Sequence, residues 1–231
     1  MDGFNQFEER IGVVFENKNL LKQAFVHRSY LNENKEFPLG HNERLEFLGD
    51  AVLELVITDY LYTKYPEKNE GDMTSLRSAL VNATALHKVG ADIGINDLLL
   101  LSRGESKDLG RARQYILANT MEALIGAIYL DRGYDMAKKF IYEFITPLLD
   151  KVIEDESWID SKSLFQEKAQ DHAGVTPAYQ TLKETGPDHD KHFTVGVYLK
   201  NELVAQGEGD SKQDAEQVAA HNALKAKGWT S

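Results

Sequence analysis

The chain has 231 residues, of which 42% are hydrophobic and 27% charged, a composition typical of a folded protein with one or two domains. It contains no cysteine, which excludes disulfide scaffolds and Cys-ligated zinc and fits the cytoplasm. Its net charge of −11 argues against nucleic-acid binding, unless bound cations carry positive charge to the phosphates.

The N-terminal segment has neither a basic start nor an apolar core, so it does not resemble a secretory signal. The strongest apolar stretches, residues 98–101 and 123–130, are too short to span a bilayer. We therefore expect no membrane association.

Residues 1 to about 150 are expected to be almost wholly helical. Apolar residues recur at helical spacing over residues 20–29, 44–64, 74–90, 114–131 and 137–152. Breaks rich in turn-forming residues separate them at 34–40, 66–71 and 104–110.

The pattern changes near an acidic stretch at residues 154–156. From residue 160 on, it predicts a helix at 163–173, strands at 179–184, 193–199 and 202–208, and a final helix. Ser211 is the expected N-cap of that helix, which ends at Lys227 before Gly228. The predicted domains are therefore residues 1–152 and 160–229, joined by a linker at 153–159.

The most informative segment is NERLEFLGD at residues 42–50. On a helix, Glu43, Glu46 and Asp50 share one face, where like charges destabilise the helix unless a cation compensates. The alternative interpretation is a solvated acidic face. Gly49 lies inside this helix at a cost of about 1 kcal/mol relative to Ala, which indicates close packing or the close approach of a ligand.

A second polar pair, Asn119 and Glu122, shares one face of an otherwise apolar helix. If the two helices cross, these side chains join Glu46 and Asp50 in a group of four oxygen donors. Such donors suit Mg²⁺ but not zinc, because no His or Cys has the spacing of a further ligand. The residues alone therefore indicate a Mg²⁺ site between two helices.

The segment at 42–50 resembles the signature of the ribonuclease III family at all nine positions. The resemblance extends over nearly the whole chain. It implies an all-α nuclease domain followed by a small α+β (α-β-β-β-α) double-stranded-RNA-binding domain. It also implies that Glu46, Asp50 and Glu122 occupy metal-binding positions, with Asp50 and Glu122 catalytic.

The same resemblance assigns supporting roles to three further residues. Glu43 and Glu70 fall on other acidic positions of the family's cleft, and Phe47 falls where an aromatic side chain enters a socket on the partner subunit. Asn119 departs from the family pattern, which most often has Asp there. An amide oxygen can still ligate Mg²⁺, but it brings no charge.

In the second domain, the resemblance implies RNA contacts at Ser163, Gln166 and Glu167, at His189, and at Ser211 and Lys212. Such domains contact 2′-hydroxyls and phosphates of A-form duplexes. Gln213 stands where a second basic residue is usual. Acidic residues outnumber basic ones beyond residue 157, which predicts weak binding with a shallow salt dependence.

We therefore expect a homodimeric endoribonuclease for double-stranded RNA that uses Mg²⁺, for which Mn²⁺ substitutes, and no organic cofactor. A metal-activated water would attack the phosphate, leaving a 3′-hydroxyl and a 5′-phosphate. The resemblance implies short 3′ overhangs and substrates such as precursor ribosomal RNA and structured messenger RNA.

Two other functions fit the residues less well. Because Asn119 lacks a charge, one is a dimer that binds duplex RNA with weak or no cleavage. The other is a helical Mg²⁺-dependent hydrolase of small phosphates with an unrelated C-terminal tail.

Overall fold

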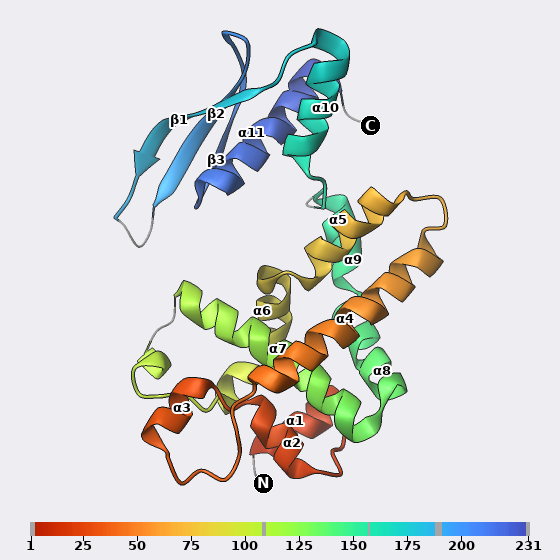
Figure 1. The fold of residues 1–231 in the computed structure, drawn as a ribbon, viewed down its shortest axis with the longest axis vertical. Coiled ribbons are helices and arrows are strands. Elements are labelled where there is room, and N and C mark those ends of the chain that lie inside the picture. The colour runs from red at the N-terminus through yellow and green to blue at the C-terminus, as the bar shows by residue number, and fades with distance from the viewer. Residues whose placement is uncertain (1–2, 108–109, 157, 188–190, 230–231) are drawn as a thin grey trace. The chain divides into compact units, whose positions relative to one another are not determined.

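The computed structural model describes residues 3–107, 110–156, 158–187 and 191–229. The chain divides into two compact units, Met1–Trp158 and Ile159–Ser231. The first is built from helices, and the second has the order helix, three strands, helix (Figure 1). The expected fold class is confirmed. Within the described residues, no helix is both long and apolar enough to cross a bilayer.

The first unit contains α1 (Gly3–Ile11), α2 (Lys18–Ala24), α3 (Arg28–Glu33), α4 (Glu43–Lys64), α5 (Glu70–Val81), α6 (Ala83–Asp92), α7 (Arg111–Arg132), α8 (Tyr134–Phe144) and α9 (Leu148–Glu154). Two short 3₁₀ helices, Ile95–Leu98 and Glu105–Lys107, lie between α6 and α7.

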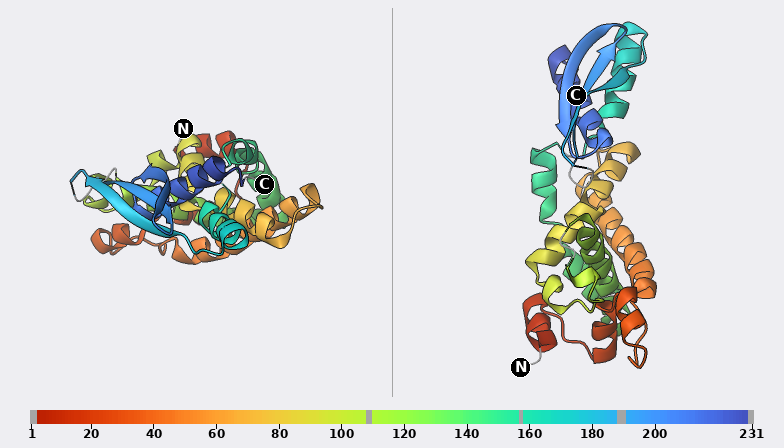
Figure 2. Two further views of the ribbon diagram at one scale, coloured as in Figure 1. Left: turned by 90° about the horizontal axis from the view of Figure 1, so that it is seen from above. Right: turned by 90° about the vertical axis from the view of Figure 1, so that its left-hand side faces the viewer.

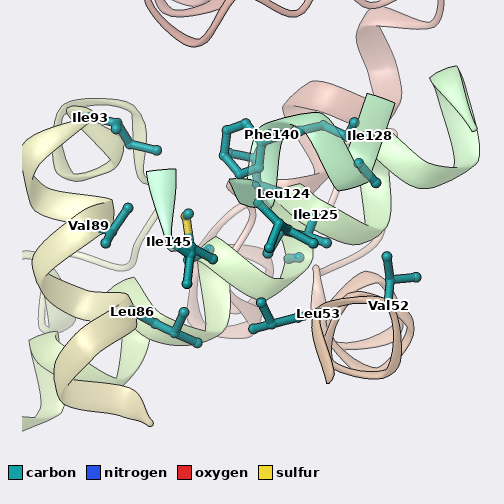
Figure 3. Close-up of a cluster of buried hydrophobic side chains, with 14 of the residues drawn as sticks. Val52, Leu53, Leu86, Val89, Ile93, Leu124, Ile125, Ile128, Phe140 and Ile145 are labelled. Carbon is teal, nitrogen blue, oxygen red and sulfur yellow. The ribbon is translucent and has the colours of Figure 1, made fainter. Parts of the chain in front are cut away.

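The core of this unit surrounds α7, whose middle is buried almost all round. Side chains of α4, α6 and α8 pack against it; Figure 3 labels Val52, Leu53, Leu86 and Phe140 among them, together with Leu124 of α7. Each such side chain contributes about 1.5–3 kcal/mol when fully buried. A helix buried on most of its surface holds any polar side chain on it in a defined place, which matters for Asn119 and Glu122.

Three ranges that the sequence predicts as single helices are wrong, because each contains two: 20–29 spans α2 and the start of α3, 74–90 spans α5 and α6, and 137–152 spans α8 and α9. Long-range pairing makes the first break, since Val26 bridges Leu100 and the His27 N–H donates to the Leu100 carbonyl.

Local chemistry makes the other two breaks. The Asn82 side chain accepts a hydrogen bond from the Ala85 N–H at 2.9 Å, which caps α6 and ends α5. Pro147 precedes α9 and has no N–H to continue α8.

The second unit contains α10 (Ser161–Ala173), β1 (Ala178–Thr185), β2 (His192–Leu199), β3 (Glu202–Gly209) and α11 (Lys212–Lys227). The strands form an antiparallel sheet in the order β1-β2-β3. Val195 and Val197 of β2 point into a core covered by both helices, which lie on one face of the sheet (Figure 2).

The ends of α11 are as predicted. The Ser211 hydroxyl accepts a hydrogen bond from the Asp214 N–H at 3.1 Å, and Gly228 ends the helix with a φ of 68°. A left-handed residue at this position is favourable for glycine because it has no Cβ.

A candidate acidic centre where two helices cross

Helices α4 and α7 make the most extensive helix–helix contact among the described elements (Figure 1). They touch through backbone atoms at two glycines. A Cβ atom on Gly49 would overlap the Glu122 carbonyl oxygen and lie 2.8 Å from the Gly126 nitrogen. A Cβ atom on Gly126 would overlap the Leu45 carbonyl oxygen. Of the two explanations for Gly49, close packing is the one that the structure shows.

This contact brings carboxylates of the two helices together. Glu46 and Asp50 flank Gly49 along α4, and Glu122 is the residue of α7 whose backbone meets Gly49. Burial raises the pKa of Glu122 to about 7, and the charges of Asp50 and Glu46 add to the effect. Burial also raises the pKa of Glu46, helped by the charges of Glu43 and Asp50. The carboxylates therefore repel one another.

Asn119 lies one helical turn before Glu122 on α7 and is partly buried. Its amide is therefore on the same helix face as the Glu122 carboxylate. Glu46 is also partly buried, whereas Asp50 is exposed. The four predicted oxygen donors thus come from two adjoining helix faces, with a water-accessible side at Asp50.

Among the described residues, no three His, Asp or Glu side chains converge closely enough to enclose a metal ion. Mg²⁺ keeps several waters and is commonly bound by one or two carboxylates together with substrate phosphates. A donor set of carboxylate and amide oxygens therefore suits Mg²⁺ better than zinc, which favours His and Cys.

The two supporting acidic residues have different surroundings. Glu43 is the first residue of α4, where its carboxylate lies 3.5 Å from Arg28 Nη1 and 3.7 Å from His41 Nδ1. Its charge reaches Glu46. Glu70 begins α5 and accepts a hydrogen bond from the Thr74 hydroxyl at 3.0 Å. It lines a separate pocket of about 200 Å³ between α4 and α5.

Phe47 projects away from the core of the first unit. Its side chain is 81% exposed, and Leu130 of α7 is 53% exposed. Both line a shallow pocket of about 650 Å³ together with Leu20, Leu45 and Leu48. Exposed apolar side chains grouped around a concave surface are typical of an interaction site.

The described RNA-contact candidates of the second unit lie on its surface helices. Ser163, Gln166 and Glu167 are exposed on α10 and line a shallow pocket of about 480 Å³. Ser211 caps α11, and the exposed Lys212 follows it with its ammonium 5.7 Å from the centre of the Phe193 ring. His189 lies outside the described residues.

Sequence reasoning missed three residues that the structure places at or near the acidic centre. The sequence carries a signal for Gly126, because it is a glycine inside a helix and lies four residues after Glu122. The same signal identified Gly49, which precedes Asp50. Arg28 and Arg77 pair with carboxylates at the ends of the acidic face of α4. A single arginine on a helix carries no local signal of such a role.

Comparisons with known proteins agree with this geometry. Residues 17–149 match a family model described as ribonuclease-III-like, and residues 161–227 match the double-stranded RNA binding motif. The chain is 44% identical over 221 residues to Ribonuclease 3 of Enterococcus faecalis, which covers 96% of each chain. It is 46% identical over 220 residues to that of Natranaerobius thermophilus, covering 95% of this chain and 94% of the relative.

Among solved structures, the chain is similar to the nuclease domain of ribonuclease III from Campylobacter jejuni. The TM-score is 0.57 at 37% identity, covering 63% of this chain and 97% of that one.

Proposed function

The chain belongs to the ribonuclease III family and is an endoribonuclease acting on double-stranded RNA, and we propose that it cuts with Mg²⁺ held by Glu46, Asp50, Asn119 and Glu122. The observation that carries this proposal is the glycine contact between α4 and α7, which gathers carboxylates that repel one another. A divalent cation between them would remove that repulsion.

When bound, Mg²⁺ would lower the pKa of a coordinated water and offset negative charge on the scissile phosphate. Asp50 and Glu122 are the proposed catalytic residues, and Glu46 and Asn119 complete the donor set. With its pKa raised to about 7, Glu122 must lose its proton before it can serve as a charged ligand. At limiting Mg²⁺, cleavage should therefore rise with pH through neutrality, because deprotonated Glu122 binds the metal more tightly.

No protein side chain needs to act as a nucleophile in this reaction. Water would attack the phosphate, a 3′-hydroxyl would leave, and a 5′-phosphate would remain. Mn²⁺ would replace Mg²⁺ because it also binds oxygen donors. No organic cofactor is proposed. Glu43 and Glu70 would support the acidic cleft, Glu43 by acting on Glu46.

We propose that two copies of the chain assemble through Phe47, each cutting one strand to leave short 3′ overhangs. The support is the 81% exposure of Phe47 beside a concave apolar surface. The similar nuclease domain from Campylobacter jejuni has a region involved in dimer formation.

We propose that residues 160–229 bind duplex RNA, joined by residues 153–159 to the nuclease domain at 1–152. Support comes from the family match at 161–227 and from the exposure of the contact candidates on α10 and of Lys212. The proposed contacts are Ser163, Gln166, Glu167, His189, Ser211 and Lys212. Precursor ribosomal RNA and structured messenger RNA are the proposed substrates, and the cytoplasm is the proposed location.

Cleavage of a labelled RNA duplex in Mg²⁺ tests the metal centre. Glu122→Gln and Asp50→Asn should abolish cleavage and leave duplex binding in place, because only the acidic centre changes. Asp59→Asn is the matched control, since this α4 carboxylate pairs with Lys138 instead. Cleavage by Glu122→Gln at near the parent rate would show that the proposed centre is wrong.

A further inference from the structure

Two arginines pair with carboxylates at opposite ends of the acidic face of α4. Arg28 Nη1 lies 3.5 Å from Glu43 Oε1, and Arg77 Nη1 lies 3.6 Å from Glu54 Oε2. Glu54 continues the face of Glu43, Glu46 and Asp50, because it follows Asp50 by one helical turn. The helical rise from Glu43 to Glu54 is about 16 Å, with the proposed metal centre between them.

We propose that Arg28 and Arg77 bind backbone phosphates of the duplex on either side of the scissile bond and so position the strand over the acidic centre. This rests on the proposed metal centre, because that centre defines where the strand must lie. An acidic face repels a polyanion, so cations at its two ends would offset that repulsion where the backbone arrives and leaves.

The surroundings of Arg77 suit a phosphate. Its side chain is 30% exposed, and its Nη1 donates to the Thr58 hydroxyl at 3.0 Å. Both described contacts use Nη1, which leaves Nη2 and Nε for two phosphate oxygens. The pocket of about 200 Å³ beside it is lined by Tyr62, whose hydroxyl can donate to a phosphate, and by Thr74, whose hydroxyl donates to Glu70 and can accept from a ribose 2′-hydroxyl.

Arg28 is held more loosely than Arg77. Its side chain is 72% exposed, and the Glu43 side chain is 46% exposed. An ion pair this open to water contributes little to stability, so exchanging the carboxylate for a phosphate costs little. Arg28 can therefore move onto the RNA without disturbing the fold.

The competing explanation is that Arg77 only ties α5 to α4. Arg132 is the matched control, because its side chain is 31% exposed, lies 3.4 Å from Glu16, and donates to the Val14 carbonyl at 2.9 Å. Like Arg77, it has one ion pair and one hydrogen bond, but it is the last residue of α7, 13 positions after Asn119.

The experiment measures binding of the full-length protein to a fluorescent RNA duplex over a range of salt concentrations. Ca²⁺ replaces Mg²⁺, and the RNA is checked to remain intact. Arg28→Gln and Arg77→Gln should each lower the slope of log Kd against log salt concentration by about one per lost phosphate contact. At low salt, each should weaken binding about tenfold. Arg77→Lys should keep the slope, and Arg132→Gln should match the parent.

Comparing Glu54→Gln with Asp59→Asn separates the two explanations, because each removes one negative charge from an ion pair of α4. If Arg77 binds phosphate, Glu54→Gln should tighten RNA binding more than Asp59→Asn does, because it also frees Arg77. If Arg77 only ties two helices together, the two substitutions should have equal effects on RNA binding. This comparison still decides if Arg77→Gln fails to fold.

If Arg77→Gln or Arg28→Gln keeps the salt slope of the parent, the proposal that both arginines bind phosphate is wrong. A lower melting temperature of Arg77→Gln with the parent slope would show that Arg77 only stabilises the fold. Failure of the metal centre would show itself differently, as cleavage by Glu122→Gln.

Discussion

The backbone of Gly49 touches the backbone of Glu122, and no room remains between them for a Cβ atom. This contact sets how closely α4 approaches α7, and therefore how closely the carboxylates of Glu46 and Asp50 approach that of Glu122. The spacing of the proposed catalytic carboxylates thus depends on a residue with no side chain.

Gly49→Ala should push the two helices apart. Forcing extra atoms into a packed contact typically costs about 1–3 kcal/mol, and the neighbouring atoms here are backbone, which cannot rotate away. Chemical denaturation should show the loss, together with reduced cleavage. Gly90→Ala is the control, because its Cβ would lie 3.4 Å from Ile95 Cδ1 and 3.5 Å from the Leu117 carbonyl oxygen, which are ordinary contact distances. That variant should be neutral or slightly more stable.

Glu122→Gln should change how stability depends on pH. Burial, followed by the charges of Asp50 and Glu46, raises the pKa of Glu122 from 4.5 to about 7 in the folded state. The folded state therefore binds more protons between these pH values, and stability falls as pH rises through them. Without metal at pH 8, the variant should be more stable by about 1 kcal/mol, discounted for partial exposure.

Thermal denaturation in a chelator at pH 5 and pH 8 measures this effect of Glu122. The difference between parent and Glu122→Gln should be near zero at the lower pH and a few degrees at the higher one. Adding Mg²⁺ at pH 8 should stabilise the parent more than the variant. If the melting temperatures of the parent and of Glu122→Gln depend on pH in the same way, the charge of Glu122 does not destabilise the metal-free protein.

Phe47→Ala should shift the protein from dimer to monomer. An aromatic anchor in a partner's pocket commonly contributes about 2 kcal/mol or more. Because Phe47 is 81% exposed in the single chain, the substitution should leave the fold intact. Sedimentation at several concentrations measures the shift, with Val218→Ala, an exposed apolar residue of α11, as the control. A Phe47→Ala protein that stays dimeric would contradict the assignment.

A chain ending after Trp158 should fold as an independent nuclease domain. Trp158 packs against the core of the first unit, and the Lys68 ammonium lies 4.7 Å from the centre of its ring, so the cut belongs after it. This chain should bind duplex RNA less tightly and cut best at low salt, where attraction to phosphate is least screened. If the shortened chain and the full-length chain bind duplex RNA with equal affinity at physiological salt, residues 159–231 have no role in binding.

Asn119→Asp should lower the Mg²⁺ concentration for half-maximal cleavage. A unit charge pair at about 4 Å contributes on the order of 4 kcal/mol at an effective dielectric near 20. The new carboxylate also adds to the repulsion around Glu122, so the metal-free protein should become less stable. Titrating Mg²⁺ against cleavage rate for both proteins measures the first effect. Coincident curves would mean that Asn119 lies outside the influence of the metal.

Local patterns were enough to predict much of this molecule. Ser211 and Gly228 define the ends of α11 because capping depends on neighbouring backbone groups. The alternation of residues 193–199 predicts β2, since one face of that strand is buried. The acidic face of α4 follows from helical spacing alone, and so does the shared face of Asn119 and Glu122.

Tertiary structure decided what lies outside the reach of those patterns. The break between α2 and α3 depends on pairing of Val26 with Leu100, far away in the sequence. The place of Glu70 in a pocket beside Arg77, and the pairing of Arg77 with Glu54, depend on how α5 packs against α4. Helical spacing says which residues share a face. Which face meets which is decided by packing, and here by two glycines that let backbones touch.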